Sequence, residues 1–285
     1  MICRGFEVSE GRNSIDSLAT LEAALWNLLA EFDREAIWWR GHANGAWDLR
    51  PSAHRIGDHG SGYDGVSLFG HFKILAPGRL GHRQRPSSEI EWLFLAQHYG
   101  LPTVLLDWTA NPLTALYFVV SEGSGSGGDG CLYAFSPSRF NSAFADPENP
   151  GKSAEGLRSY DEPLVHAMAM QATGFKDEAI RRRLFPHLQT LPPLPKAIAL
   201  AGAEMDERIV AQAGRFTLHR CGDAIDKLPA SHEYLRRFVV PGERKNALRT
   251  LLQTMGIERW SLFPDLQALA DGLRRREFGR LQPGR

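Results

Sequence analysis

The first residues that could do chemistry are Arg40, Gly41 and His42, which follow the apolar run "IWW" at 37–39. Aromatic and β-branched residues favour strands, so we expect a strand that ends at Arg40. The planar guanidinium of an arginine can hold a pyrophosphate or a carboxylate through two parallel hydrogen bonds. A glycine beside it lets a ligand or another backbone come close, and a histidine can donate to phosphate or carry a proton near neutral pH. The triplet is therefore a candidate anion-binding site.

A second polar group ends the apolar run "TVLLDW". Asp107 and Thr109 can hold a ribose hydroxyl or activate a nucleophile, and Trp108 can stack on an aromatic ring. Each of them also has a structural interpretation. A buried carboxylate needs a partner, so Asp107, like Asp48, can form an ion pair with Arg40. Thr109 can cap the next helix, and Trp108 can be an ordinary core residue.

The composition is that of an ordinary globular protein, with 285 residues, 43% of them apolar, and a formal net charge of zero. A protein that binds nucleic acid by charge carries a surplus of Lys and Arg, and we interpret the basic runs at 181–183 and 274–276 as solvated helix faces. The three cysteines show neither metal nor disulfide spacing, which favours a reducing compartment, the cytoplasm. We see no signal peptide and no long apolar run, so we expect no membrane span.

Several well-known kinds of site have no signature in the sequence. There is no Walker loop, no GxGxxG after a strand, no HExxH helix and no GxSxG elbow. The histidines are too loosely spaced to indicate a metal site, and we predict no metal; those considered are His54, His59, His71 and His82.

The densest structural signal lies at 88–120. We expect a helix that begins with a capping box at Ser88 and stops at Gly100, then the buried strand "TVLLDW", then a helix capped by Asn111. Elsewhere we expect helices at 14–32, 162–171, 176–184, 243–255 and 264–277, loops at 55–70 and 121–130, and strands in "CLYAF", "KAIALAG", "RIVAQAGRFTLH" and "LRRFVVPG". Gln97 and His98 are interpreted as polar groups that satisfy a helix end. Together these elements predict one α+β domain over residues 1–285.

Five stretches of the chain together resemble the FRG domain, a family named for its aromatic-Arg-Gly motif. They are "WRGH" at 39–42, "AWDLRPS" at 46–52, "AQHYGLPTVLLDWTANPLTALYFV" at 96–119, "RIVAQAGRFTLH" at 208–219 and "GIERWSLFPDL" at 256–266. The resemblance covers about residues 20–275, and its most specific stretch is 96–119. It implies a bacterial protein of a kind found among toxins and in anti-phage defence.

The chain also resembles the ADP-ribosyltransferase superfamily, whose members read NAD with three strand-borne motifs. Arg40-Gly41 is similar to the first motif, an Arg or His at a strand end. "LLDWT" with the helix after it is similar to the second, and "DERIVAQAGRF" to the third, a strand that bears a Glu. This resemblance implies an ADP-ribosyltransferase-like split mixed sheet flanked by helices at both ends, with NAD as the substrate.

The third motif leaves two candidates for a catalytic residue. When Gly214 and Phe216 are aligned with the pattern of the superfamily, the position of its catalytic Glu corresponds to a residue near Arg208. Glu207 is one residue away, on the opposite face of a strand, whereas Gln212 shares the face of Arg208. A Glu can polarise a ribose hydroxyl and stabilise an oxocarbenium-like transition state. Glu207 can equally belong to an exposed charge cluster with Arg208, so both candidates stay open.

We therefore expect a cytoplasmic toxin or anti-phage effector that binds NAD or a related nucleotide and cleaves the nicotinamide–ribose bond, with water or a macromolecule as acceptor. The expected binding residues are Arg40, Gly41, His42, Trp108 and Thr109, and the expected catalytic residues are Arg40, Asp107, Glu207 and Gln212.

Two other functions fit the same residues. One is a metal-assisted nuclease or phosphoesterase, in which Asp107 and His42 or His98 bind the metal or act as acid and base. The other is a non-catalytic module that senses a partner through the basic helix at 274–276.

Overall fold

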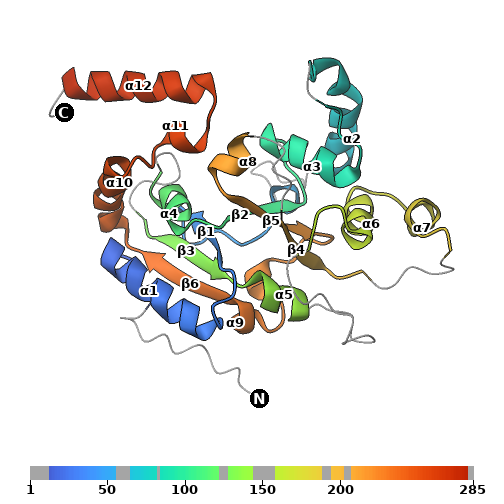
Figure 1. Ribbon diagram of the computed structural model, residues 1–285, viewed down its shortest axis with the longest axis horizontal. Coiled ribbons are helices and arrows are strands. Elements are labelled where there is room, and N and C mark those ends of the chain that lie inside the picture. Colours follow the sequence, from blue (N-terminus) through green and yellow to red (C-terminus); the bar gives the residue numbers. More distant parts are fainter. Residues whose placement is uncertain are drawn as a thin grey trace. The chain divides into compact units, whose positions relative to one another are not determined.

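The computed structural model describes residues 13–55, 65–81, 84–121, 128–143, 158–187, 194–201 and 207–281. Helices and antiparallel strands make up the described part (Figure 1), which confirms the α+β class. The chain divides into two compact units. The first unit consists of Met1–Trp47, Thr109–Phe135 and Leu235–Arg285, and the second of Asp48–Trp108 and Ser136–Tyr234. The single domain over 1–285 and the ADP-ribosyltransferase-like sheet stay predictions.

The sheet of the first unit contains β1 (Trp38–His42), β3 (Gly130–Phe135) and β6 (Leu235–Val240). β3 lies between the other two strands and pairs antiparallel with both. Arg40 lies opposite Tyr133, and the pairing continues to His42, opposite Cys131. The prediction that the strand ends at Arg40 is therefore wrong. Arg40 is the middle residue of β1, because the backbone groups of Gly41 and His42 also find partners on β3.

Three helices cover one face of this sheet: α1 (Leu18–Glu31), α4 (Pro112–Val120) and α10 (Lys245–Thr254) (Figure 1). Their apolar side chains pack with Trp39, which is 2% exposed. Trp38 is buried to the same extent and packs against Phe135, its cross-strand partner. The two tryptophans thus fix β1 from opposite faces, as the alternation of side chains along a strand predicts.

Two helices follow α10 in the first unit: α11 (Arg259–Leu262) and α12 (Leu266–Leu281). The backbone of α12 packs closely on α11 at Gly272, where an added Cβ would lie 1.8 Å from Cε3 of Trp260. Among the described residues, no helix combines the length and the apolar character needed to cross a membrane.

The second unit contains β4 (Ala197–Ala201), β5 (Gly214–His219) and β2 (Leu105–Thr109), with β5 in the middle. Thr109, the last residue of β2, belongs to the first unit. The helices of the second unit are α2 (Gly65–Leu75), α3 (Glu89–His98), α5 (Pro137–Ala143), α6 (Pro163–Ala172), α7 (Asp177–Leu184), α8 (Glu207–Ala211) and α9 (Ser231–Tyr234). Its core joins α3 and α6 to the strands, and the rings of Phe94 and Phe216 lie 4.8 Å apart in that core.

The strand and the helix ends predicted at 88–120 are confirmed, but the capping box is not complete, because Glu91 Oε2 accepts from the backbone N–H of Ser87 at 2.6 Å. Ser88 Oγ accepts a hydrogen bond from the backbone N–H of Glu91 at the start of α3 (3.4 Å). Gly100 takes the left-handed conformation after the end of that helix, with φ of +78°. Asn111 Oδ1 accepts from the backbone N–H of Leu113 (2.9 Å) and caps α4. These caps define the ends of the two helices that precede and follow β2 in the sequence.

The prediction of one strand over 208–219 is wrong in its first half. Glu207–Ala211 form the short helix α8, and β5 begins only at Gly214. Ala213 between them has φ of +47°, the left-handed conformation that commonly ends a helix. The loop predicted at 55–70 is also wrong in part, because α2 begins at Gly65. Parts of the two predicted loops, 56–64 and 122–127, lie outside the described residues, as do Cys3, His59 and His82.

The stability of the second unit is expected to depend on pH through His54. Burial first, and then the nearby Arg50, lower the pKa of His54 below 6.5. The folded protein therefore binds a proton there less readily than the unfolded chain does. Stability should be fully present above pH 6.5 and fall as the pH drops from 6.5 toward the lowered pKa. Urea unfolding at about pH 7.5 and about pH 5.5 measures this loss. His54→Gln should reduce the loss, and an unchanged loss in that variant would assign it to other groups.

Candidate functional site

Arg40 and His42 form a hydrogen-bonded pair on one face of the first unit's sheet. Arg40 Nε donates to His42 Nε2 at 2.9 Å. Since Nε2 accepts, the ring carries its proton on Nδ1, which lies 3.2 Å from the carbonyl oxygen of Trp47. His42 is only 2% exposed. The pair thus fixes the direction of both side chains.

The surroundings of this pair are aromatic and basic. The rings of Tyr133 and Trp47 lie edge-on to His42, with centroids at 5.4 and 6.0 Å. Arg237 on β6 donates to the carbonyl oxygen of Gly45 at 3.2 Å. Burial raises the pKa of the Cys131 thiol on β3, which disfavours the reactive thiolate.

Gly41 gives room to a neighbouring helix. A Cβ at this position would lie 2.0 Å from the carbonyl oxygen of Ala115 and 2.8 Å from Val119 Cγ2, both on α4. The sequence left open whether this glycine admits a ligand or another backbone. On this side of β1, it admits the backbone of α4.

Thr109 is engaged locally. Its Oγ1 accepts from the backbone N–H of Asn111 at 3.0 Å, and its backbone lies opposite Trp39. The hydroxyl therefore stabilises the turn into α4, which is the structural interpretation that the sequence left open.

A pocket in the second unit brings together Asp107, Trp108 and Gln212, which were candidates from the sequence. It encloses about 50 Å³. The other lining residues come from α3, α8 and β5: Phe94, Gln97, His98, Arg208, Ile209, Gly214 and Phe216. A carboxylate, a guanidinium, two amides and three large aromatic rings thus line one pocket.

The carboxylate of Asp107 is held in place by an amide. Gln97 Nε2 donates to Asp107 Oδ2 at 2.8 Å. The orientation of that amide is fixed in turn, because Gln97 Oε1 accepts from Thr103 Oγ1. Asp107 is nevertheless the exposed residue of an otherwise buried strand. Its charge is therefore oriented by the protein and accessible from solution.

Trp108 forms a wall of the pocket and has its polar atom bound inside the core. It is 3% exposed, and its Nε1 donates to Thr217 Oγ1 at 3.1 Å. Thr217 Oγ1 lies 3.0 Å from His219 Nε2, so the indole belongs to a buried polar chain. These bonds hold the indole rigidly, as expected if Trp108 is an ordinary core residue.

α8 supplies Arg208 to the pocket, and the turn that follows α8 supplies Gln212. Arg208 Nη1 donates to the carbonyl oxygen of His98 at 3.1 Å, which ties α8 to the end of α3. The backbone N–H of Gln212 donates to the carbonyl oxygen of Arg208 at 3.0 Å. The prediction that Gln212 shares the face of Arg208 on a strand is wrong, because Arg208 lies on α8 and Gln212 in the turn after it, although both line the pocket. Glu207 is exposed and lies outside the pocket lining.

Two contributors to the pocket were missed by sequence reasoning. Gln97 was interpreted as a helix-end group, and Arg208 as part of an exposed charge cluster. The spacing of Arg208 and Gln212 is the signal that could have paired them, had the segment been recognised as a helix. Arg40–His42 belong to one unit, whereas Asp107 and Gln212 belong to the other. The expectation that all of these residues act together on one NAD molecule stays a prediction. Within the described ranges, no three His, Cys, Asp or Glu side chains gather as a potential metal site.

Removing the guanidinium of Arg40 is expected to lower stability. Arg40→Met keeps an unbranched apolar stem and loses the charge-assisted bond to His42. The free energy of unfolding should fall by about 1.5–3 kcal/mol, the usual contribution of a hydrogen bond to a charged group. Urea unfolding of the variant measures the change. A variant as stable as the natural protein would mean that Arg40 has no structural role.

Comparison with known proteins gives one match. Residues 35–126 match the model of the FRG domain family, which confirms the FRG resemblance over that part of the chain. The match includes Arg40–His42 and Asp107–Thr109 and ends before α8. No curated protein and no solved structure matches the chain.

Proposed function

We propose that the protein binds NAD or a related nucleotide and cleaves its nicotinamide–ribose bond at the pocket of the second unit. One observation carries this proposal: Asp107, Arg208 and Gln212, from segments far apart in the sequence, line one pocket with aromatic walls. Aromatic surfaces with a few convergent polar groups are typical of small-molecule sites.

The chemistry of the proposed reaction suits an accessible carboxylate. The bond between ribose C1′ and the nicotinamide nitrogen breaks, nicotinamide leaves as a neutral molecule, and positive charge develops on the ribosyl group. A fixed negative charge beside that centre stabilises the transition state. Water then adds to C1′ and releases a proton, which gives ADP-ribose; another nucleophile in place of water would give an ADP-ribosylated product.

Each polar residue has a role in this proposal. Asp107, oriented by Gln97, accepts from a ribose hydroxyl and faces the developing charge. Gln212 donates to the sugar or to the nicotinamide amide, and Arg208 attracts the pyrophosphate. The pocket, of about 50 Å³, is far smaller than the 300–1,000 Å³ typical of whole-ligand sites. Only the ribosyl end of the nucleotide would therefore enter it.

A toxin or anti-phage effector in the cytoplasm would act through this reaction by depleting the NAD of the cell. The biological part of the proposal draws its support from the FRG match at 35–126.

The test is to incubate the purified protein with NAD and to follow nicotinamide and ADP-ribose by chromatography. Release of nicotinamide in proportion to enzyme is the expected result. Absence of both release and NAD binding would overturn the proposal for NAD.

A further inference from the structure

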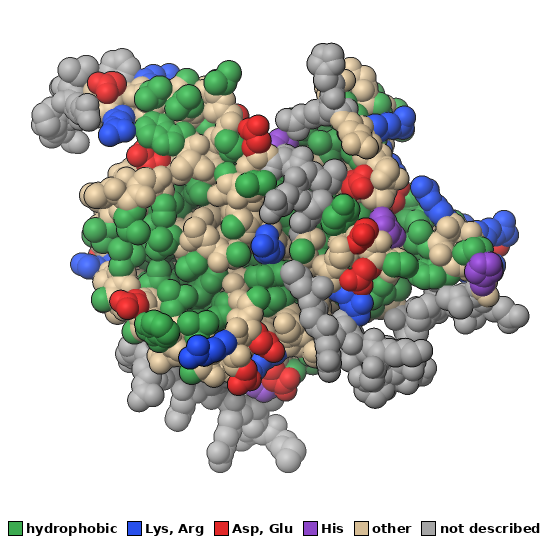
Figure 2. Space-filling model, viewed as in Figure 1, with side chains coloured by type: hydrophobic (Ala, Val, Ile, Leu, Met, Phe, Trp, Pro, Cys, Tyr) green, Lys and Arg blue, Asp and Glu red, His purple; other side chains and the backbone are tan. Residues whose placement is uncertain are grey.

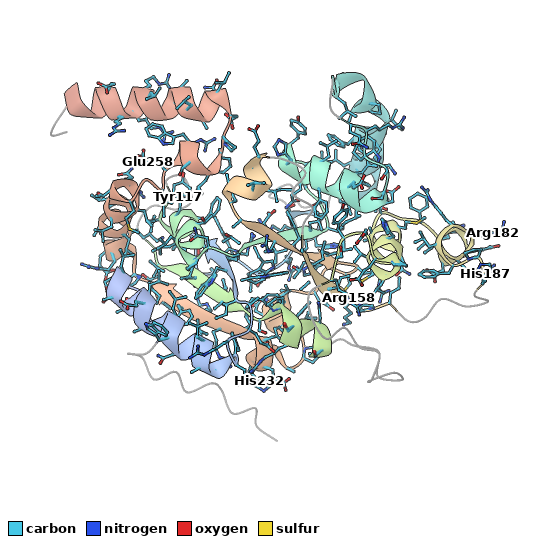
Figure 3. All side chains as sticks on the ribbon, viewed as in Figure 1. Tyr117, Arg158, Arg182, His187, His232 and Glu258 are labelled. Atoms are coloured by element: carbon cyan, nitrogen blue, oxygen red, sulfur yellow. The ribbon has the colours of Figure 1, made fainter. Side chains whose placement is uncertain are left out.

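A recess in the first unit is lined mainly by the helices that end the chain. It has a volume of about 690 Å³. Its walls come from α4, α10, α11 and α12, and the lining residues are Tyr117, Phe118, Val120, Ser121, Arg249, Thr250, Gln253, Thr254, Ile257, Glu258, Arg259, Trp260, Phe263, Gly272, Arg275 and Arg276. Figure 3 shows Tyr117 on α4 near Glu258, which precedes α11.

The charge of this recess is strongly one-sided. Four of its lining residues are arginines and one is acidic. The acidic residue, Glu258, is the N-cap of α11, where its backbone N–H donates to Ser261 Oγ at 3.0 Å. Burial raises the pKa of Tyr117 in this recess, and the charges of Arg259, Arg275 and Arg249 act in the opposite direction. The recess therefore attracts anions.

The arginines differ in how firmly they are held. Arg249 is fixed by the fold, because its Nε donates to the carbonyl oxygen of Val120 at 2.8 Å. The guanidinium of Arg259 lies 5.0 Å from the centre of the Phe263 ring. Arg275 and Arg276 are exposed on α12. Figure 2 shows basic and hydrophobic side chains next to one another over this helix.

Aromatic rings line the same recess. Phe118 lies edge-on to Phe263, with ring centroids 6.3 Å apart. The indole of Trp260 packs against Gly272, as the clash of an added Cβ shows. Two rigid aromatic elements thus lie beside the arginines, and flat rings are surfaces on which a nucleobase can stack.

We propose that this recess binds a nucleoside phosphate, with the base on its aromatic side and the phosphates at Arg275 and Arg276. The volume agrees with such a ligand, because sites for small molecules typically measure about 300–1,000 Å³. An acidic peptide would satisfy the arginines, but the adjoining aromatic rings would add less to its binding. The inference does not depend on the proposed reaction in the second unit.

Calorimetry with ADP, adenosine and pyrophosphate tests the proposal. ADP should bind more tightly than either of its parts, since the base and the phosphates are held by different groups. The double charge reversal R275E/R276E should weaken ADP binding by about tenfold or more, because each replacement turns an attraction for phosphate into a repulsion. R274E is the matched control, since Arg274 lies on the same helix, outside the recess lining, and pairs with Asp271 at 3.2 Å. It should bind ADP as the natural protein does.

Several results would overturn the proposal. They are no ADP binding by the natural protein, equal binding of ADP and pyrophosphate, and an equal loss in R274E and the double variant. Binding of an acidic peptide in place of ADP would also overturn it. The variant Asp107→Asn distinguishes binding at the recess from binding at the pocket of the second unit. If Asp107→Asn loses ADP binding and R275E/R276E keeps it, ADP binds in the second unit and not in the recess. Circular dichroism of each variant checks that α12 has kept its helix.

Discussion

Replacing Asp107 with Asn is expected to reduce nicotinamide release from NAD by about 10²–10³-fold, the usual loss when one preorganised electrostatic group is removed from a site. Asn has the same shape but lacks the negative charge that would face the ribosyl cation. Asp107 is exposed, so its replacement should leave the melting temperature nearly unchanged. Steady-state nicotinamide release by the natural protein and the variant measures the effect.

Glu207→Gln is the matched control for that experiment. It removes a carboxylate from the same unit, on α8 next to Arg208 but outside the pocket lining. Its activity should equal that of the natural protein. A large loss of activity in Glu207→Gln together with full activity in Asp107→Asn would contradict the catalytic role of Asp107. It would show that Glu207 supplies the catalytic carboxylate.

Gly41→Ala is expected to give the largest loss of stability. The added methyl group would lie 2.0 Å from the carbonyl oxygen of Ala115, which is backbone and cannot rotate away. Either β1 or α4 must move, and Trp39 packs in the cluster that joins them. We expect the free energy of unfolding to fall by about 3 kcal/mol or more, the upper range for overpacked cores. Urea unfolding gives the value.

Gly70→Ala is the control for the effect of substitution itself. Gly70 lies within α2, and an added Cβ there has no atom within 4 Å. Alanine should raise stability by about 0.5–1 kcal/mol, because glycine is a poor helix former. If Gly41→Ala proved as stable as the natural protein, the close packing of α4 on β1 would be refuted.

The sequence predicted those elements whose signals are local. The helix ends at Ser88, Gly100 and Asn111 each depend on one side chain or one backbone angle, so their positions could be read directly. Trp38 and Trp39 were placed correctly because alternation along a strand needs no knowledge of the partner.

The errors concern features that depend on partners distant in the sequence. The end of β1 was placed at Arg40 because the run of aromatic and β-branched residues stops before it, whereas pairing with β3 carries the strand to His42. α8 was missed because five residues are too few to show a helical period. The bond from Gln97 to Asp107 joins a helix to a strand, and no local pattern specifies it.

The most direct test of the central claim is a crystal structure of D107N with NAD, in which slowed cleavage keeps the substrate intact. We predict that the nicotinamide ribose lies in the pocket of the second unit, with a ribose hydroxyl in hydrogen-bonding distance of the side chain at 107 and the pyrophosphate facing Arg208. NAD bound only in the recess between α10 and α12, or bound nowhere at millimolar concentration, would contradict the account.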